Sequence, residues 1–284
     1  MFVMVNPEAT GPFEYQLAIA HNRDEFFGRP STPAAFNGSL LYGTDMTPGK
    51  EGGTWLGMNK QGKIAALLNS HGKGTEVAAD LRGRGKIVVD YLASSSSAVD
   101  YSRSLAQNAP LYNPFIFIAL EPMPSHDSSR NWSHVYLHSI DGKEEHLAPG
   151  VYGFGNSSRH SPYRKVQHGL QQFQQAFIKH SFEDSKEALM ADLFDLLKDK
   201  TKLWPDPQLS AARSDMSQEI CRELSSCFVG MPEAVQYGTR AHTVILINGD
   251  DDVTFVEQSR TDSAGGWRTD KFEFKLETNE KKTQ

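Results

Sequence analysis

The chain has 284 residues, of which 38% are hydrophobic and 23% charged, a composition typical of a soluble globular protein with one or two domains. Its 29 Lys and Arg residues are outnumbered by 35 Asp and Glu residues. This balance argues against a general nucleic-acid or membrane-surface binder, because both need a clustered basic excess. The two cysteines, Cys221 and Cys227, are too few for a disulfide framework and are not spaced as a zinc site, which favours a reducing compartment.

Targeting and membrane signals are weak. No Lys or Arg precedes Arg23, so the N-terminus lacks the basic region of a signal peptide and the Arg-rich pattern of a transit peptide. The longest strongly apolar run, residues 115–120, is far short of the roughly 20 residues that span a bilayer. We therefore expect no transmembrane segment and no nucleic-acid partner.

The first part of the chain predicts strands. Residues 15–20 form a continuous apolar run that predicts a buried strand, paired with residues 2–5 across a Pro- and Gly-containing turn. Further strands are expected at residues 40–42, 54–58 and 64–68, separated by Gly-rich turns at 49–53 and 59–62.

The middle of the chain changes to helical spacing. Helices are expected over residues 86–92, 97–106 and 163–180, and a fourth is marked by Leu189, Leu193, Leu196 and Leu197. Ser161 followed by Pro162 has the form of an N-cap with Pro at the first helical position. Strands are expected at 115–120 and 135–138, and a loop with one short helix at 204–227. Three strands in a meander, at 243–247, 253–257 and 272–276, end the chain.

The order of strands, then helices, then strands indicates an α+β protein and not the strict alternation of a doubly wound fold. Strands from both ends of the chain are expected to pair in one core. We therefore predict a single domain over residues 1–284.

Asn22-Arg23-Asp24-Glu25 follows directly on the predicted strand. Four consecutive hydrogen-bonding side chains at a strand end place both signs of charge near a sheet edge, where a ligand or catalytic group can sit. A salt-bridged turn is the structural alternative. Further motifs follow at residues 26–30, 43–46, 49–57, 82–85, 111–113, 149–153 with Asn156, 237–240 and 267–276. Together, and in this order, they resemble the transport and Golgi organisation protein 2 family, also called the NRDE family.

The resemblance implies the fold of the N-terminal-nucleophile hydrolases, a four-layer αββα sandwich with two antiparallel sheets between helical layers. In such hydrolases the first residue of the mature chain is Cys, Ser or Thr, and its own α-amine is the base. The family usually has Cys after the initiator Met, whereas this chain has Phe2 and no such residue before Thr10. Aligning Pro7 to the family pattern suggests a start about three residues late. Either a shortened chain or a lost nucleophile explains this, so no catalytic residue is assigned and enzymatic activity is left open, with the balance against it.

By the same resemblance, the NRDE motif contributes Asn22, Arg23, Asp24 and Glu25 to a ligand site, with Arg23 and Asp24 facing the nucleophile position. Asn69 and Asn156 would supply amide donors of oxyanion-hole type. Arg240 would bind a carboxylate or phosphate bidentately. Turn residues and buried ion pairs that hold the sheet ends together are an equally good interpretation of these side chains.

Arg82 and Arg84 lie just before a predicted helix. Two guanidinium groups beside exposed helix N–H donors make an anion site that suits a phosphate or a propionate. A charged N-terminal turn is the alternative. The aromatic walls expected for a ligand pocket are Phe26, Phe27, Trp55 and Phe115.

The ten histidines raise the question of metal or haem. His134 and His138 lie in a predicted strand, where residues four apart are separated by roughly 13 Å, so structural zinc is not expected. His21, beside the NRDE motif, His242, after Arg240, and the soft side chain of Met4 are the candidate haem ligands. Ordinary strand-end and core positions explain them as readily.

Three functions remain open. The family resemblance implies an intracellular haem-binding and haem-trafficking protein, with haem as cargo and the hydrolase-like pocket as its site. The alternatives are a binder of acyl-coenzyme A or anionic lipid in lipid homeostasis, and an N-terminal-nucleophile amide or thioester hydrolase. The expected location is the cytoplasm, with association with mitochondria left open, and the sequence leaves the oligomeric state undetermined.

Overall fold

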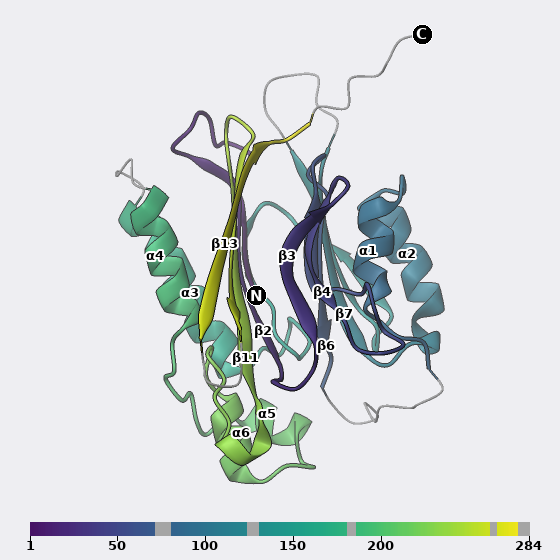
Figure 1. The fold of residues 1–284 in the computed structure, drawn as a ribbon, viewed down its shortest axis with the longest axis vertical. Helices are drawn as coiled ribbons and strands as arrows, with labels where there is room; N and C mark the ends of the chain where they lie inside the picture. The colour runs from purple at the N-terminus through teal and green to yellow at the C-terminus, as the bar shows by residue number, and fades with distance from the viewer. Residues whose placement is uncertain (72–80, 124–130, 181–185, 262–265, 278–284) are drawn as a thin grey trace.

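The computed structural model describes residues 1–71, 81–123, 131–180, 186–261 and 266–277 (Figure 1). Two antiparallel sheets pack face to face, and each carries a pair of helices on its outer side (Figure 1). The predicted four-layer αββα sandwich of the α+β class is therefore confirmed.

The first sheet has six strands and joins the two ends of the chain. Its order is β10 (Gly150–Gly153), β1 (Phe2–Val5), β2 (Tyr15–Phe26), β11 (Tyr237–Asn248), β12 (Asp252–Arg260) and β13 (Trp267–Lys275). The predicted pairing of residues 2–5 with 15–20 is confirmed, with Phe2 opposite Ala20. The predicted C-terminal meander is also confirmed, as β11, β12 and β13.

The second sheet has seven strands in sequence order. They are β3 (Ser31–Asn37), β4 (Leu40–Asp45), β5 (Leu56–Asn59), β6 (Ile64–Asn69), β7 (Phe115–Pro122), β8 (Trp132–His138) and β9 (Lys143–His146). The sequence analysis missed β3, β9 and β10, and all three are edge strands. An edge strand buries less apolar surface and often carries charge, Pro or an irregular register, so its alternation is weak. β3 shows this directly, since Pro33 lies within a register shift between Thr32 and Ala35.

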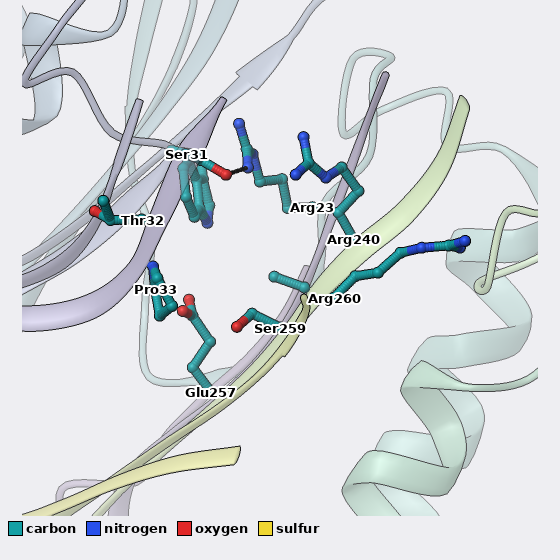
Figure 2. A pocket seen from close by; sticks show the side chains of 10 residues that line it. Arg23, Ser31, Thr32, Pro33, Arg240, Glu257, Ser259 and Arg260 are labelled. Atoms are coloured by element: carbon teal, nitrogen blue, oxygen red, sulfur yellow. Dashed lines mark hydrogen bonds between the residues drawn. The ribbon is translucent and has the colours of Figure 1, made fainter. Parts of the chain in front are cut away.

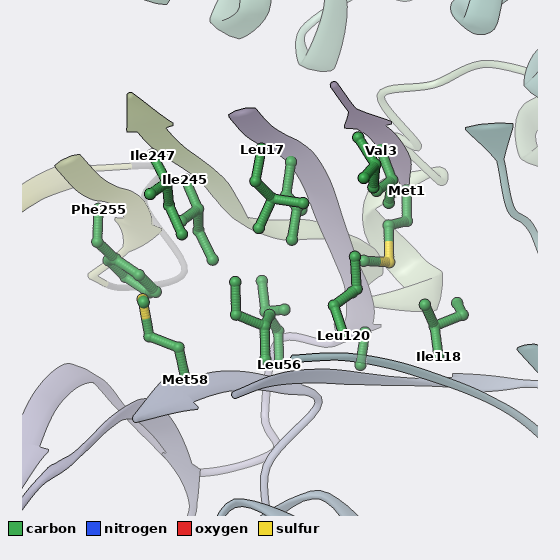
Figure 3. Close-up of a cluster of buried hydrophobic side chains, with 14 of the residues drawn as sticks. Met1, Val3, Leu17, Leu56, Met58, Ile118, Leu120, Ile245, Ile247 and Phe255 are labelled. Carbon is green, nitrogen blue, oxygen red and sulfur yellow. The ribbon is translucent and has the colours of Figure 1, made fainter. Parts of the chain in front are cut away.

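The main core lies between the sheets (Figure 3). Side chains alternate along each central strand, so that Leu17 and Ile19 of β2 face the other sheet while Ala18 and Ala20 face the helices. The core side chains labelled in Figure 3 are Met1, just before β1, then Val3, Leu17, Ile245, Ile247 and Phe255 from the first sheet and Leu56, Met58, Ile118 and Leu120 from the second.

Two helices cover each outer face. The pair α1 (Lys86–Ala93) and α2 (Ala98–Asn108) packs on the seven-stranded sheet, followed by a 3₁₀ turn at Ala109–Leu111. The pair α3 (Arg164–His180) and α4 (Lys186–Leu197) packs on the six-stranded sheet. None of the helices in the described ranges combines the length and the apolar character that crossing a bilayer requires.

Two predictions about the helices were wrong: the start of α3 and the number of short helices in the segment 204–227. α3 begins at Arg164, so Ser161 does not cap it; instead the Arg164 N–H donates to the Asp206 carboxylate at 2.8 Å. A cap supplied from a distant part of the chain leaves no local sequence signal. The segment 204–227 contains two short helices, α5 (Pro207–Ala212) and α6 (Gln218–Leu224), where one was expected; a further 3₁₀ turn follows at Glu233–Val235.

Candidate anion-binding site

The NRDE motif lies within β2 and not after it, which corrects the sequence-based placement. β2 continues to Phe26 because β11 extends beside it, and Asn22, Arg23 and Asp24 pair with His242, Ala241 and Thr239. Alternation along the strand then divides the motif between the two faces of the sheet. Asn22 and Asp24 face the helices, whereas Arg23 and Glu25 face the other sheet.

On the helix side, the motif makes internal bonds. Asn22 Nδ2 donates to the carbonyls of Leu197 at 2.8 Å and Cys227 at 2.9 Å. Asp24 accepts from Thr239 Oγ1 at 2.6 Å. Burial raises the pKa of Asp24, while Lys165 and the Thr239 hydrogen bond oppose the rise. These contacts tie β2 to β11 and to the end of α4, which is the behaviour of a structural clamp.

On the inter-sheet side, Arg23 is 8% exposed. Its guanidinium lies 3.7 Å from the ring centroid of Trp55, and Nη1 donates to Ser31 Oγ at 2.8 Å. Burial, followed by the nearby charge of Arg240, lowers the pKa of Arg23 to about 10, so the group stays cationic at neutral pH. Among the described residues, the neighbouring carboxylates of Glu25 and Asp45 are paired with Arg29, at 2.9 Å and 2.5 Å, and none forms an ion pair with Arg23.

Arg240 reaches the same place from a β-bulge. The register of β11 against β2 shifts between Thr239 and Ala241, and the unpaired residue is Arg240. Its Nη1 donates to the carbonyls of Phe26 at 2.9 Å and Arg29 at 2.5 Å. Its Nε is buried and has no hydrogen-bond partner. The predicted approach of Arg23, Trp55 and Arg240 is therefore present in the structure.

These three side chains line a cavity of about 30 Å³ between the sheets (Figure 2). The other lining residues are Ser31, Thr32, Pro33, Ala241, Glu257, Ser259 and Arg260. Glu257, which the sequence analysis missed, is 1% exposed, and its carboxylate accepts from the Ala34 N–H at 2.7 Å. Burial raises the pKa of Glu257 to about 7, against the opposing effects of that N–H and of Arg23. The sequence signal that could have identified Glu257 is the presence of a charged residue in the apolar segment 253–257.

Glycines from three of the motifs make room for Trp55. A Cβ at Gly43 would lie 2.7 Å from the Trp55 ring, and one at Gly53 would lie 2.9 Å from the Cα of Gly85. The Thr54 N–H donates to the Gly85 carbonyl at 2.9 Å in the same close contact. The glycines of the 43–46, 49–57 and 82–85 motifs therefore position the indole against Arg23.

The arginines of the 82–85 motif do not converge on the cavity. Arg82 is exposed, and Arg84 Nη1 donates to the Pro114 carbonyl at 2.6 Å. Burial lowers the pKa of Arg84, and the charge of Arg29 lowers it further. Neither Arg82 nor Arg84 lines the cavity.

Asn69 and Asn156 lie together, since Asn156 Nδ2 donates to the Asn69 carbonyl at 2.8 Å. One of the two N–H groups of this amide is therefore in use, and a role as oxyanion donor stays a prediction for both residues. Of the expected aromatic walls, only Trp55 lines the cavity. The ring centroid of Phe27 lies 4.0 Å from the guanidinium carbon of Arg260. Phe26 is exposed and its ring contacts Tyr237, whereas Phe115 is buried under α1 and α2.

The candidate haem ligands are not gathered in one place. His21 shares the inter-sheet side with Arg23 but is 1% exposed; burial, then the N-terminal amine and Arg23, hold its pKa well below the ordinary value. His242 and Met4 lie on the helix side. Burial lowers the pKa of His242 to about 3, and its ring stacks on Trp267 with centroids 4.7 Å apart. In the described residues, no three or more His, Cys, Asp or Glu side chains converge to hold a metal ion.

Comparison with known proteins identifies relatives along the whole chain. The chain is 34% identical over 284 residues to the Transport and Golgi organization protein 2 homolog of Homo sapiens, covering 98% of this chain and 99% of that protein. It is 36% identical over 274 residues to Transport and Golgi organization protein 2 of Drosophila melanogaster, covering 92% of each. Among solved structures, a mutant conjugated bile acid hydrolase from Clostridium perfringens aligns over 98% of this chain and 99% of its own, with 11% identity and a TM-score of 0.45.

A TM-score of 0.45 is too low for this structural likeness to support an inference about the chain. The sequence relationship does carry weight, because it extends over nearly the full length of both proteins. The family model for Transport and Golgi organisation 2 also matches residues 1–262. The chain belongs to the Transport and Golgi organisation 2 family.

Proposed function

We propose that the chain binds an amphipathic anion, with haem as the first candidate cargo, and that it serves in haem trafficking. The observation that carries this proposal is the state of Arg23, a buried guanidinium that stacks on Trp55 and has no carboxylate partner among the described residues. A buried charge without a partner is costly. A bound acid group would supply the missing counter-charge, and the nearby Arg240 would share it.

The dimensions of the cavity limit how haem would bind. A volume of about 30 Å³ admits an acid group but not a porphyrin ring, since sites that enclose drug-sized ligands have roughly 300–1,000 Å³. A propionate would therefore enter between Arg23 and Arg240 while the ring stays at the rim. None of His21, His242 and Met4 lines the cavity. Attachment through the acid groups suits a cargo that has to be released again.

A haem titration followed at the Soret band tests this proposal. Wild-type protein is expected to shift the band relative to haem in buffer, and Arg23→Ala to weaken binding by roughly tenfold or more, as for loss of a charge-assisted hydrogen bond. Arg103→Ala is the matched control, because Arg103 is exposed and pairs only at the surface with Asp100 and Glu144. A wild-type spectrum identical to that of free haem, or equal binding by Arg23→Ala, would contradict the proposal.

Acyl-coenzyme A or an anionic lipid is the second candidate. It is favoured by further guanidinium groups at the site: Arg260 also lines the cavity, and Arg84 interacts electrostatically with Arg29, which is itself paired with Glu25 and Asp45. These guanidinium groups suit phosphates. Thermal shift with coenzyme A esters against haem separates the two, because only a ligand of the folded state raises the melting temperature.

The cytoplasm, in association with mitochondria, is the location that fits either cargo.

A further inference from the structure

Resting on the proposed anion-binding role, we infer that the cavity between Arg23 and Arg240 takes one carboxylate group and selects carboxylates against phosphate monoesters. The ligand class is an amphiphile with a carboxylate head, which includes both a fatty acid and a porphyrin propionate. Phosphates would have to bind outside the cavity.

The first argument is space. A water-sized atom needs about 10–15 Å³ of accessible cavity, so a cavity of about 30 Å³ holds roughly two to three such atoms. A carboxylate presents two oxygens and is planar. A phosphate monoester presents three terminal oxygens around a tetrahedral centre, and it needs more of the same space than a carboxylate does.

The second argument is the fixed orientation of the donors. The Arg23 guanidinium is held by the Trp55 ring and by Ser31 Oγ. The Arg240 guanidinium is held by two backbone carbonyls, which leaves its buried Nε without a partner. Planar guanidinium groups in fixed positions match a planar carboxylate and lose little conformational entropy on binding it. Figure 2 shows Arg23 and Arg240 on one side of the cavity and Glu257 across from them.

The third argument is charge. The charged groups that line the cavity are Arg23, Arg240, Arg260 and Glu257, and Asp270 also acts electrostatically on Glu257. A second negative charge on the ligand therefore meets the buried Glu257 carboxyl as well as the arginines. A monoanionic carboxylate meets half of that repulsion, and when Glu257 holds a proton the repulsion is removed. Glu257 thus offsets part of the attraction that the three arginines exert on a ligand, and the repulsion it adds is twice as large for a phosphate dianion as for a carboxylate.

Calorimetric titration of the full chain with octanoate and with octyl phosphate, which share one alkyl chain, tests the inference. Octanoate is expected to bind roughly tenfold tighter than octyl phosphate, which corresponds to about 1.4 kcal/mol. Arg23→Ala should abolish this preference and weaken the binding of octanoate. Arg103→Ala should change neither the preference nor the affinity for octanoate. Glu257→Gln keeps a side-chain oxygen for the Ala34 N–H and removes the charge. In that variant the affinity for octyl phosphate should rise roughly fivefold or more relative to the affinity for octanoate.

The outcomes separate this inference from the proposed function. If haem binding depends on Arg23 while octyl phosphate binds as tightly as octanoate, the inference fails and the haem proposal stands. If octanoate is selected but the Soret band does not respond, the haem proposal fails and the inference stands. Binding of neither amphiphile by folded protein, checked by its thermal melt, overturns the inference. An unchanged preference in Glu257→Gln removes the role of Glu257 in selection.

Discussion

Nδ1 of His242 donates a hydrogen bond to Oδ1 of Asn22 at 2.6 Å, and this contact fixes the form of the imidazole. Asn22 Nδ2 already donates to the carbonyls of Leu197 and Cys227, so Oδ1 is the acceptor and His242 Nδ1 carries the proton. The ring is neutral, in accord with burial that lowers its pKa to about 3. The first residue of the NRDE motif thus stabilises the fold, while the second belongs to the cavity.

Asn22→Ala is expected to lower the free energy of unfolding by about 3 kcal/mol, because it leaves two carbonyls and one buried N–H unpaired. Urea denaturation measures the change. Asn108→Ala is the matched control, since Asn108 is exposed and bonds only to the Ser104 carbonyl of its own helix. A loss below about 1 kcal/mol in Asn22→Ala would show that the clamp contributes little.

Glu257 predicts a pH dependence of stability. Its pKa is raised from 4.5 to about 7, so the folded state holds the proton more tightly than the unfolded chain does. The stabilisation is fully present below about pH 4.5 and is lost as pH rises through about 7. Its size is about 3 kcal/mol, from 1.36 kcal/mol for each pH unit between the two values.

Glu257→Gln should therefore gain up to about 3 kcal/mol of stability relative to wild type between pH 4.5 and pH 7.5. Chemical denaturation of both proteins at each pH measures this difference. Every other titratable group is common to both proteins, so its contribution cancels in the comparison. Parallel stability curves would contradict the raised pKa.

Gly43→Ala tests whether the position of Trp55 matters for binding. The new Cβ would lie 2.7 Å from the indole, so the ring must leave its present position against Arg23. We expect a stability loss of about 1–3 kcal/mol, as for overpacking, together with weaker binding of haem in the Soret titration. Gly28→Ala is the control, because a Cβ there meets nothing within 4 Å. Unchanged haem binding in a folded Gly43→Ala protein would remove Trp55 from the proposed site.

Asp206 caps two helices at once. Its carboxylate accepts from the Arg164 N–H at the start of α3 and from the N–H groups of Gln208 and Leu209 in α5. Asp206→Ala should lower the free energy of unfolding by about 2–4 kcal/mol, since each cap contributes roughly 1–2 kcal/mol. Asp206→Asn should cost less, and Asp195→Ala, at an exposed position of α4, should cost little. Thermal and urea unfolding measure all three, and equal stability of the Ala variants would contradict the double cap.

Most elements were predictable from the sequence because their signals are local. The alternation of Leu17 and Ile19 with Ala18 and Ala20 marks a strand whose two faces are both buried, and the helix expected over residues 97–106 is α2, which Ser97 caps. Two of the failures involve a distant partner. β3 pairs with the neighbouring β4, but its Ala34 N–H also donates to Glu257, which is 223 residues away in the chain, and α3 begins where Asp206 caps it.

The candidate site divides in the same way. The order of the motifs along the chain resembles the family, and this resemblance indicated Arg23, Trp55 and Arg240 as site residues. Only the tertiary structure decided that the NRDE motif lies inside a strand, so that the two-residue period sends Arg23 toward Trp55 and Asn22 toward the helices. It also brought Glu257 opposite the arginines, since the six-stranded sheet places β2, β11 and β12 side by side. Local pattern determines which segments form strands, whereas the pairing of distant strands determines which side chains share a cavity.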